Sequence, residues 1–152
     1  EKNMNDRNEE YEYIGKNIGK VHRMSMMYFS KKFSKFNIGA GQCFLLVRLY
    51  ENQGITQEEL SSMLSLDKTT IARNLKKLDD QGYIKRIKRE DDKRSYSIDV
   101  TEKSLKIKDE VYRILHSWEE KLNSCLTNDE SKQLIILLNK LNNINLLKEE
   151  EI

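Results

Sequence analysis

The sequence has no proline, only two cysteines and no long apolar run. Proline is the residue that most often interrupts helices, so its absence favours long continuous ones. Cys43 and Cys125 form no C-x-x-C pair, which predicts no disulfide framework. The longest apolar runs, such as Leu134–Leu138, are far too short to cross a bilayer, and we expect no membrane partner. With 152 residues, 34% charged and 38% apolar, the chain suits one globular domain or two small units sharing a core.

The sequence also lacks the residue groupings of enzymes and metal sites. It contains no Ser/His/Asp or Cys/His constellation, no glycine-rich phosphate loop and no paired carboxylates at a plausible cleft. His22 and His116 are single residues on different expected helices, so zinc binding is not expected. The polar start, residues 1–6, lacks the apolar stretch of a secretory signal, which predicts a cytoplasmic location. We therefore expect a non-enzymatic protein without a cofactor or a metal.

What the chain does have is an uneven distribution of charge. Its net charge is only +2, with +3 on residues 1–38, +1 on residues 39–100 and −2 on residues 101–152. Within residues 67–94, however, ten Lys and Arg residues stand against six Asp and Glu residues, a net of +4. A positive excess gathered on one segment is what the neutralisation of nucleic-acid phosphates requires.

Apolar residues at helical spacing predict two helices in the first third of the chain. The first covers residues 9–36 and ends before Gly39 and Gly41, since paired glycines make poor helix interior. The second covers about 40–52 and is apolar around most of its circumference, which predicts that it is buried on most sides. Ile55 then adds one short strand segment.

A helix-turn-helix is predicted over residues 56–82. Thr56 and Glu59 form a capping box that starts a short helix, and Asp67 is the N-cap of the next. Gly82 ends the second helix. The inner faces are expected to be Leu60, Met63 and Leu64 on the first helix and Ile71, Leu75 and Leu78 on the second.

The opposite face of the second helix is largely cationic. At 100° per residue it carries Thr69, Arg73, Lys76 and Asp80, with Thr70 and Lys77 on the flanks. Because the apolar face must point inward, these side chains are expected to point to solvent or to a polyanion.

A basic β-hairpin follows, with strands over 83–89 and 95–100 and a wholly charged tip over 90–94. On the second strand, Tyr96, Ile98 and Val100 are expected to alternate inward. Helix, turn, helix and hairpin in this order predict a winged helix-turn-helix, which places one helix in the DNA major groove and the hairpin beside it. The predicted fold is mainly α, with a small β-hairpin wing and long dimerisation helices.

Two long helices are expected after the hairpin, over 102–125 and over about 128–148, the latter started by a capping box at Thr127. Together with the helix at 9–36 they show wide apolar faces, which the compact unit at 56–100 covers only in part. Such surface would aggregate in a monomer. We therefore expect these helices to interleave in a two-fold homodimer.

The stretch from Thr56 to Thr101 strongly resembles the MarR family of bacterial transcription regulators. The matching residues are Gln42, Leu60, Leu64, the run Asp67–Arg73, Leu78, the run Gly82–Arg86, the wing Asp92-Lys93-Arg94, and Val100–Thr101. The flanking helix order also matches, so the resemblance covers nearly the whole chain. It implies a single domain over 1–152, with a winged helix-turn-helix over 39–100 and dimerisation helices over 1–38 and 101–152.

By this resemblance the protein is a homodimeric regulator, most often a repressor, that binds double-stranded DNA at a pseudo-palindromic operator. Base contacts are expected from Thr69, Thr70 and Arg73, and phosphate contacts from Lys68, Lys76 and Lys77. In the wing, Arg94, with Lys93, is expected to enter the minor groove, and Asp92 to brace Arg94 through a charge-assisted pair. Glu90, Asp91 and Asp92 make this wing more acidic than many in the family, so the strength of its contact is open.

The resemblance also places an effector pocket between the dimer helices and the DNA-reading region, suited to a small apolar or phenolic ligand. Two alternatives stay open at this point. One is a winged-helix architectural or protein-interaction module with little sequence preference. The other is a cysteine-based, redox-responsive regulator of the same fold. Relatives of that kind use a cysteine near the start of the first long helix, where this chain has none, and burial of Cys43 would blunt its reactivity.

Overall fold

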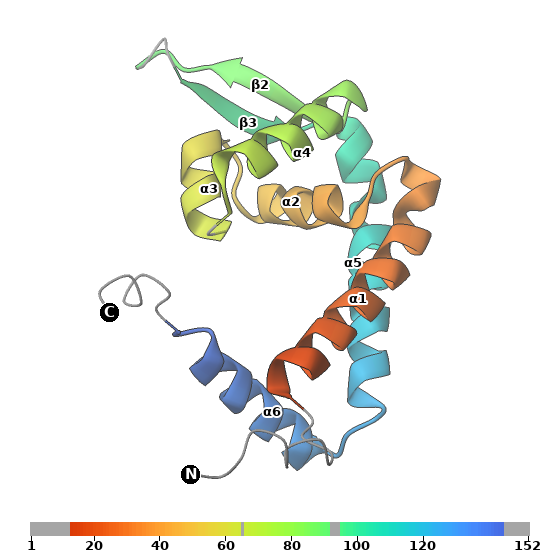
Figure 1. Ribbon diagram of the computed structural model, residues 1–152. Helices are drawn as coiled ribbons and strands as arrows, with labels where there is room; N and C mark the ends of the chain where they lie inside the picture. Colours follow the sequence, from red (N-terminus) through yellow and green to blue (C-terminus); the bar gives the residue numbers. More distant parts are fainter. Residues whose placement is uncertain (1–12, 65, 92–94, 145–152) are drawn as a thin grey trace, which may run out of the picture. The chain divides into compact units, whose positions relative to one another are not determined.

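The computed structural model describes residues 13–64, 66–91 and 95–144 (Figure 1). Its elements are α1 (Ile14–Phe33), the 3-10 helix η2 (Ser34–Phe36), α2 (Ala40–Glu51), β1 (Ile55–Thr56), α3 (Gln57–Leu64), α4 (Lys68–Asp80), β2 (Ile84–Lys88), β3 (Tyr96–Val100), α5 (Glu102–Asn123) and α6 (Asn128–Leu141). The chain divides into two compact units, residues 1–114 and 115–152. The predicted mainly α fold with a β-hairpin wing is confirmed.

The described strands form one antiparallel sheet in the order β1-β3-β2. Ile98 of the central strand lies opposite Ile55 of β1, and Val100 lies opposite Ile84 of β2. All four of these side chains are buried. Tyr96 shares a face with Ile98 by alternation, but it pairs with Lys88 next to the tip of the hairpin and is 48% exposed. The prediction that Tyr96 points into the core is therefore wrong.

The core of the first unit is formed by the helix-turn-helix, α2 and the inner face of the sheet. Fully buried side chains include Leu45, Leu46 and Leu49 of α2, Leu60 of α3, and Ile71, Leu75 and Leu78 of α4. Met63 is 48% exposed, so its predicted place on the inner face of α3 is wrong. It lies about 60° around the helix from Leu60, in the last turn of α3.

Buried hydrogen bonds tie the start of α5 to the helix-turn-helix. The Tyr50 hydroxyl donates to the Ser104 carbonyl at 2.7 Å, and the Ser104 hydroxyl donates to the Tyr83 carbonyl. Ser104 is fully buried, which the apolar pattern of this helix did not reveal. The Thr101 hydroxyl donates to the carbonyl of Gly82 at 2.6 Å. The end of α4, the start of β2 and the first turn of α5 are therefore fixed relative to one another.

The first helix is shorter than its predicted span of 9–36. α1 begins at Ile14 and ends at Phe33, after which the chain tightens into η2; residues 9–12 lie outside the described part. Asn37 then adopts a left-handed conformation with φ of 57° and donates its N–H to the carbonyl of Ser34. Asparagine tolerates this conformation better than most residues, so it ends the helix before the glycines do.

The two C-terminal helices also end earlier than expected. α5 ends at Asn123 instead of 125, and α6 ends at Leu141 instead of about 148, although residues 145–148 are outside the described range. The asparagines that follow Leu141 favour turns over helix continuation, because their side chains compete for backbone hydrogen bonds. The capping box at Thr127 is confirmed. No helix in the described ranges is both long and apolar enough to span a bilayer.

Candidate nucleic-acid interface

The recognition helix α4 starts at a well-defined N-cap. One oxygen of the Asp67 carboxylate accepts the Thr70 backbone N–H at 2.8 Å, and the other accepts the Thr70 hydroxyl at 2.6 Å. These hydrogen bonds, the hydroxyl first, hold the pKa of the Asp67 carboxyl below its usual value. The hydroxyl hydrogen of Thr70 is thus engaged within the cap, which leaves its oxygen lone pairs for any other contact. Gly82, with φ of +74°, ends the helix as predicted.

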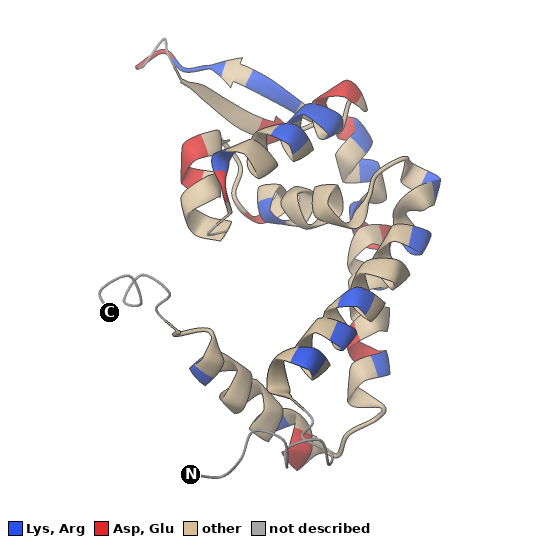
Figure 2. Ribbon diagram, viewed as in Figure 1, with Lys and Arg blue, Asp and Glu red and all other residues tan. Residues whose placement is uncertain are grey.

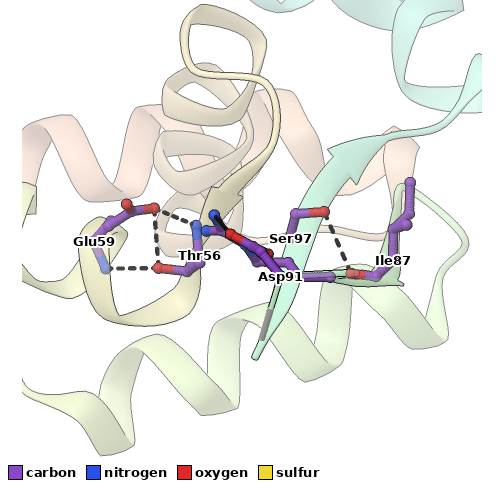
Figure 3. Close-up of polar contacts among 6 residues, drawn as sticks. Thr56, Glu59, Ile87, Asp91 and Ser97 are labelled. Atoms are coloured by element: carbon purple, nitrogen blue, oxygen red, sulfur yellow. Dashed lines mark hydrogen bonds and ion pairs between the residues drawn. The ribbon is translucent and has the colours of Figure 1, made fainter. Parts of the chain in front are cut away.

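The supporting helix α3 is fixed in a similar way. The Glu59 carboxylate accepts the Thr56 backbone N–H at 2.8 Å, while the Glu59 N–H donates to the Thr56 hydroxyl oxygen at 3.2 Å (Figure 3). The backbone hydrogen bond from Thr56 is the main reason why the pKa of Glu59 is lowered. The predicted capping box is therefore confirmed, and it anchors the start of α3 at the end of β1.

Some cations on the outer face of α4 are in ion pairs and others are not. Lys76 pairs with Asp80 at 3.0 Å, and Lys68 pairs with Glu58 of α3 at 3.5 Å. Arg73 and Lys77 are exposed and have no polar partner within the described ranges. Figure 2 shows this positive charge along α4 and continuing onto β2. Exposed cations without partners are the ones most readily available to a phosphate or a base edge.

The strand β2 adds a second row of cations that the site prediction missed. Lys85 and Lys88 are exposed and unpaired in the part of the chain that the structure describes. Arg86 lies 3.8 Å from Asp79 at the end of α4. The signal is present in the sequence, because these residues dominate a strand beside the recognition helix, but the net charge and the family resemblance assign them no contact with DNA.

The approach to the wing tip is partly neutralised. The guanidinium of Arg89 donates to both carboxylate oxygens of Asp91, at 2.9 and 2.8 Å. This bidentate ion pair neutralises one of the acidic side chains that would otherwise repel the phosphates of DNA. Farther from the tip, the Ser97 hydroxyl donates to the Ile87 carbonyl and ties β3 to β2 (Figure 3). The predicted wing residues Asp92, Lys93 and Arg94 lie outside the described residues.

A groove of about 430 Å³ lies between the start of α3 and the inner face of the hairpin. Its walls include Glu58 and Glu59 on one side and Arg86, Arg89 and Tyr96 on the other. Its charges are of both signs, and Arg86 and Arg89 each have a carboxylate neighbour. The groove is therefore not a cationic pocket, and it differs in place from the effector pocket predicted beside the dimerisation helices.

The cysteines and histidines lie on other elements than α4 and the hairpin, with His22 in α1 and His116 in α5. Cys43 is fully buried in α2, and burial raises the pKa of its thiol far above the usual value, so the reactive thiolate is suppressed. Cys125 is exposed near the end of α5. In the described ranges, no group of His, Cys, Asp and Glu side chains is arranged to hold a metal ion.

A capped recognition helix with free cations outward, buried on its other side and flanked by a cationic hairpin, defines a winged helix-turn-helix DNA-binding protein. The MarR family model matches residues 38–96. YybA of Bacillus subtilis strain 168, named an uncharacterized HTH-type transcriptional regulator, is 36% identical over 132 residues, or 84% of this chain and 85% of YybA. The chain belongs to the MarR family of DNA-binding transcriptional regulators, which are not enzymes.

Solved structures of the same family are similar in fold. A MarR transcriptional regulator from Methanosarcina mazei Go1 superposes with a TM-score of 0.77 at 37% identity, over 88% of this chain and 100% of that one. A cysteine-to-serine mutant of MarR from E. coli, solved in complex with operator DNA, superposes with a TM-score of 0.78 at 26% identity, over 84% of this chain and 92% of that one.

Proposed function

We propose that this protein represses transcription by binding a pseudo-palindromic operator as a homodimer, and that a small effector releases it from DNA. The observation that carries the proposal is the two-sided character of α4. Ile71, Leu75 and Leu78 are completely buried, while Arg73 and Lys77 on the other side are exposed without partners in the described ranges. The operator complex of the E. coli MarR mutant supports this use of the fold.

In the proposed complex, α4 lies in the major groove and the wing lies over the adjacent minor groove. Base readout is assigned to Arg73, Thr69 and Thr70, and Thr70 acts through its oxygen because its hydrogen is held by the cap. Phosphate contacts are assigned to Lys68, Lys76 and Lys77, with Lys85 and Lys88 of β2 added. From the wing, Arg94 and Lys93 reach the minor groove, and Asp92 braces Arg94.

A second copy of the chain is proposed to cover the apolar faces of the long helices. On α1, the exposed apolar side chains are Ile14, Ile18, Val21, Met24 and Met27. On α6, they are Leu134, Ile135, Ile136, Leu137 and Leu138, and no residue of that helix is buried. Apolar surface of this extent on two long helices supports an interface between copies, since isolated monomers rarely expose so much.

Release by an effector requires only a modest change in the spacing or tilt of the two recognition helices of the dimer. Operator half-sites about one helical turn apart demand a fixed separation, so a shift of either helix weakens both contacts together. A coupling free energy of about 1–3 kcal/mol between effector and DNA is enough for a regulatory response. The proposed effector is a small apolar or phenolic compound bound near the dimerisation helices.

The proposal is tested by selecting bound sequences from a random duplex library and then comparing Arg73→Ala with Lys77→Ala. The enriched duplex should be a palindrome, and the parent should bind it far more tightly than a scrambled duplex of equal composition. Arg73→Ala should lose most of this preference, whereas Lys77→Ala should weaken both duplexes by a similar factor. Failure to enrich any sequence would instead favour an architectural or protein-binding role.

A further inference from the structure

A buried glutamine joins the recognition helix to the start of α2. Gln42 is 8% exposed and is one of the few buried polar residues in the described part of the chain. Its Oε1 accepts the backbone N–H of Gly39 at 2.6 Å, and its Nε2 donates to Oδ1 of Asn74 on α4 at 2.6 Å. These two hydrogen bonds form a relay from Gly39 through Gln42 to Asn74. Asn74 directly follows Arg73 in the chain, so the relay ends next to the residue proposed to read bases.

The chemistry of the groups fixes the direction of this relay. A backbone N–H can only donate, so the Gln42 oxygen must face Gly39 and its amide nitrogen must face Asn74. Gly41 lies close to the Asn74 side chain, since a Cβ at position 41 would be in van der Waals contact, 3.5 Å, with the Asn74 amide. The amide nitrogen of Asn74, Nδ2, is open to solvent, since no buried side-chain nitrogen or oxygen in the described ranges lacks a partner.

The other attachments of α4 constrain its rotation less well. Its buried contacts are apolar, and apolar contacts have little directionality. Two ion pairs also join α4 to other elements, Lys68–Glu58 at 3.5 Å and Asp79–Arg86 at 3.8 Å. All four of their side chains are exposed, by 37–81%. In the described ranges, the Gln42–Asn74 bond is the only side-chain hydrogen bond between α4 and another helix.

We infer that Gln42 is a positioning residue for operator recognition, which sets the rotation of α4 about its axis through Asn74. This inference rests on the proposed function. With side chains about 5–6 Å from the helix axis, a rotation of about 10° moves their ends by about 1 Å. Hydrogen bonds to base edges tolerate about 0.5 Å, whereas long lysine side chains adjust to the phosphates. Loss of the relay should therefore reduce sequence preference more than overall affinity.

The test uses the full-length protein, the duplex selected by the parent, and a scrambled duplex of equal length and composition. Gln42→Met keeps the length of the side chain and removes both hydrogen bonds. Gln42→Glu keeps an oxygen for Gly39 and lets the Asn74 amide turn and donate, so the connection survives with reversed direction. Tyr50→Phe is the matched structural control, because it removes another buried hydrogen bond of α2, to the Ser104 carbonyl at 2.7 Å. Thermal unfolding of each variant confirms that it is folded at the assay temperature.

We expect Gln42→Met to lower the ratio of selected to scrambled affinity by about tenfold or more, the value of one good base contact. Gln42→Glu and Tyr50→Phe should keep this ratio within about twofold. Equal weakening of both duplexes by Gln42→Met would overturn the inference and leave Gln42 a purely structural residue. If Gln42→Glu lowers this affinity ratio as much as Gln42→Met does, then a hydrogen-bonded link from position 42 to Asn74 is not what maintains sequence preference. The inference fails in that case too. A parent protein without any preference would refute the proposed function instead.

Discussion

The exposed lysine at position 77 offers a quantitative test of how this surface meets DNA. Lys77 has no partner among the described residues, so its charge is available to a phosphate without first breaking an ion pair. Each phosphate neutralised contributes about 0.9 to the slope of log affinity against log salt concentration. The proposed homodimer would carry this lysine twice, so Lys77→Ala should reduce the slope by about 1.8. When the salt concentration rises from 50 to 200 mM, the factor by which the variant loses affinity should therefore be about twelve times smaller than the factor for the parent.

The assay is fluorescence anisotropy with a scrambled duplex over a series of salt concentrations. Lys106→Ala is the control, because Lys106 is an exposed, unpaired lysine of α5 in the described ranges and its loss changes the net charge equally. It should leave the slope unchanged, since it lies outside the proposed interface. The reasoning is refuted if the two variants give the same slope, because net charge alone would then explain the effect.

Three further predictions concern the cap, the ion pair of α4 and the dimer. Asp80→Asn should free Lys76 from its 3.0 Å ion pair and raise the affinity for selected and scrambled duplexes alike, measured by anisotropy; a change in preference would contradict this. Asp67→Ala should lower the melting temperature by about 2–4 °C at neutral pH. Folding lowers the pKa of the Asp67 carboxyl, so the stability that this carboxylate contributes is present above its unfolded-state pKa of about 3.9. The difference in melting temperature between parent and variant should therefore disappear as the pH falls from about 3.9 through the lower pKa of the folded state. Thermal unfolding followed by circular dichroism measures it. Ile135→Glu should shift the sedimentation coefficient toward that of a monomer at micromolar concentration while Lys132→Glu does not; equal behaviour would remove α6 from the interface.

Local patterns in the sequence predicted most of the helix-turn-helix. Asp67 indicates the N-cap of α4, because an aspartate at this position accepts a backbone N–H of the first turn and its charge suits the positive end of the helix. Ile71, Leu75 and Leu78 at helical spacing identified the buried face, and therefore the opposite face as the candidate interface. Gly82 marked the helix end for an equally local reason, since it adopts a positive φ.

The errors in burial occurred where a side chain depends on partners distant in the sequence. Tyr96 lies on the same face of β3 as Ile98, but it is next to the tip of the hairpin. There it lines an open groove instead of the core. Met63 lies at the edge of the apolar face of α3 and is only about half covered. Neither outcome is encoded in the local pattern, because each depends on how far the neighbouring elements extend.

The sequence alone determined which segments form helices and strands, where the recognition helix begins and ends, and which of its faces carries the cations, because caps, turns and periodicity act within a few residues. Only the tertiary structure decided which cations are already paired. It showed Lys76 with Asp80 and Arg89 with Asp91, while Arg73 and Lys77 stayed without partners among the described residues. It also joined Gln42 to Asn74, 32 positions apart in the chain. Such pairings depend on the packing of whole elements, since hydrogen bonds and ion pairs require ångström-scale placement that no local pattern specifies.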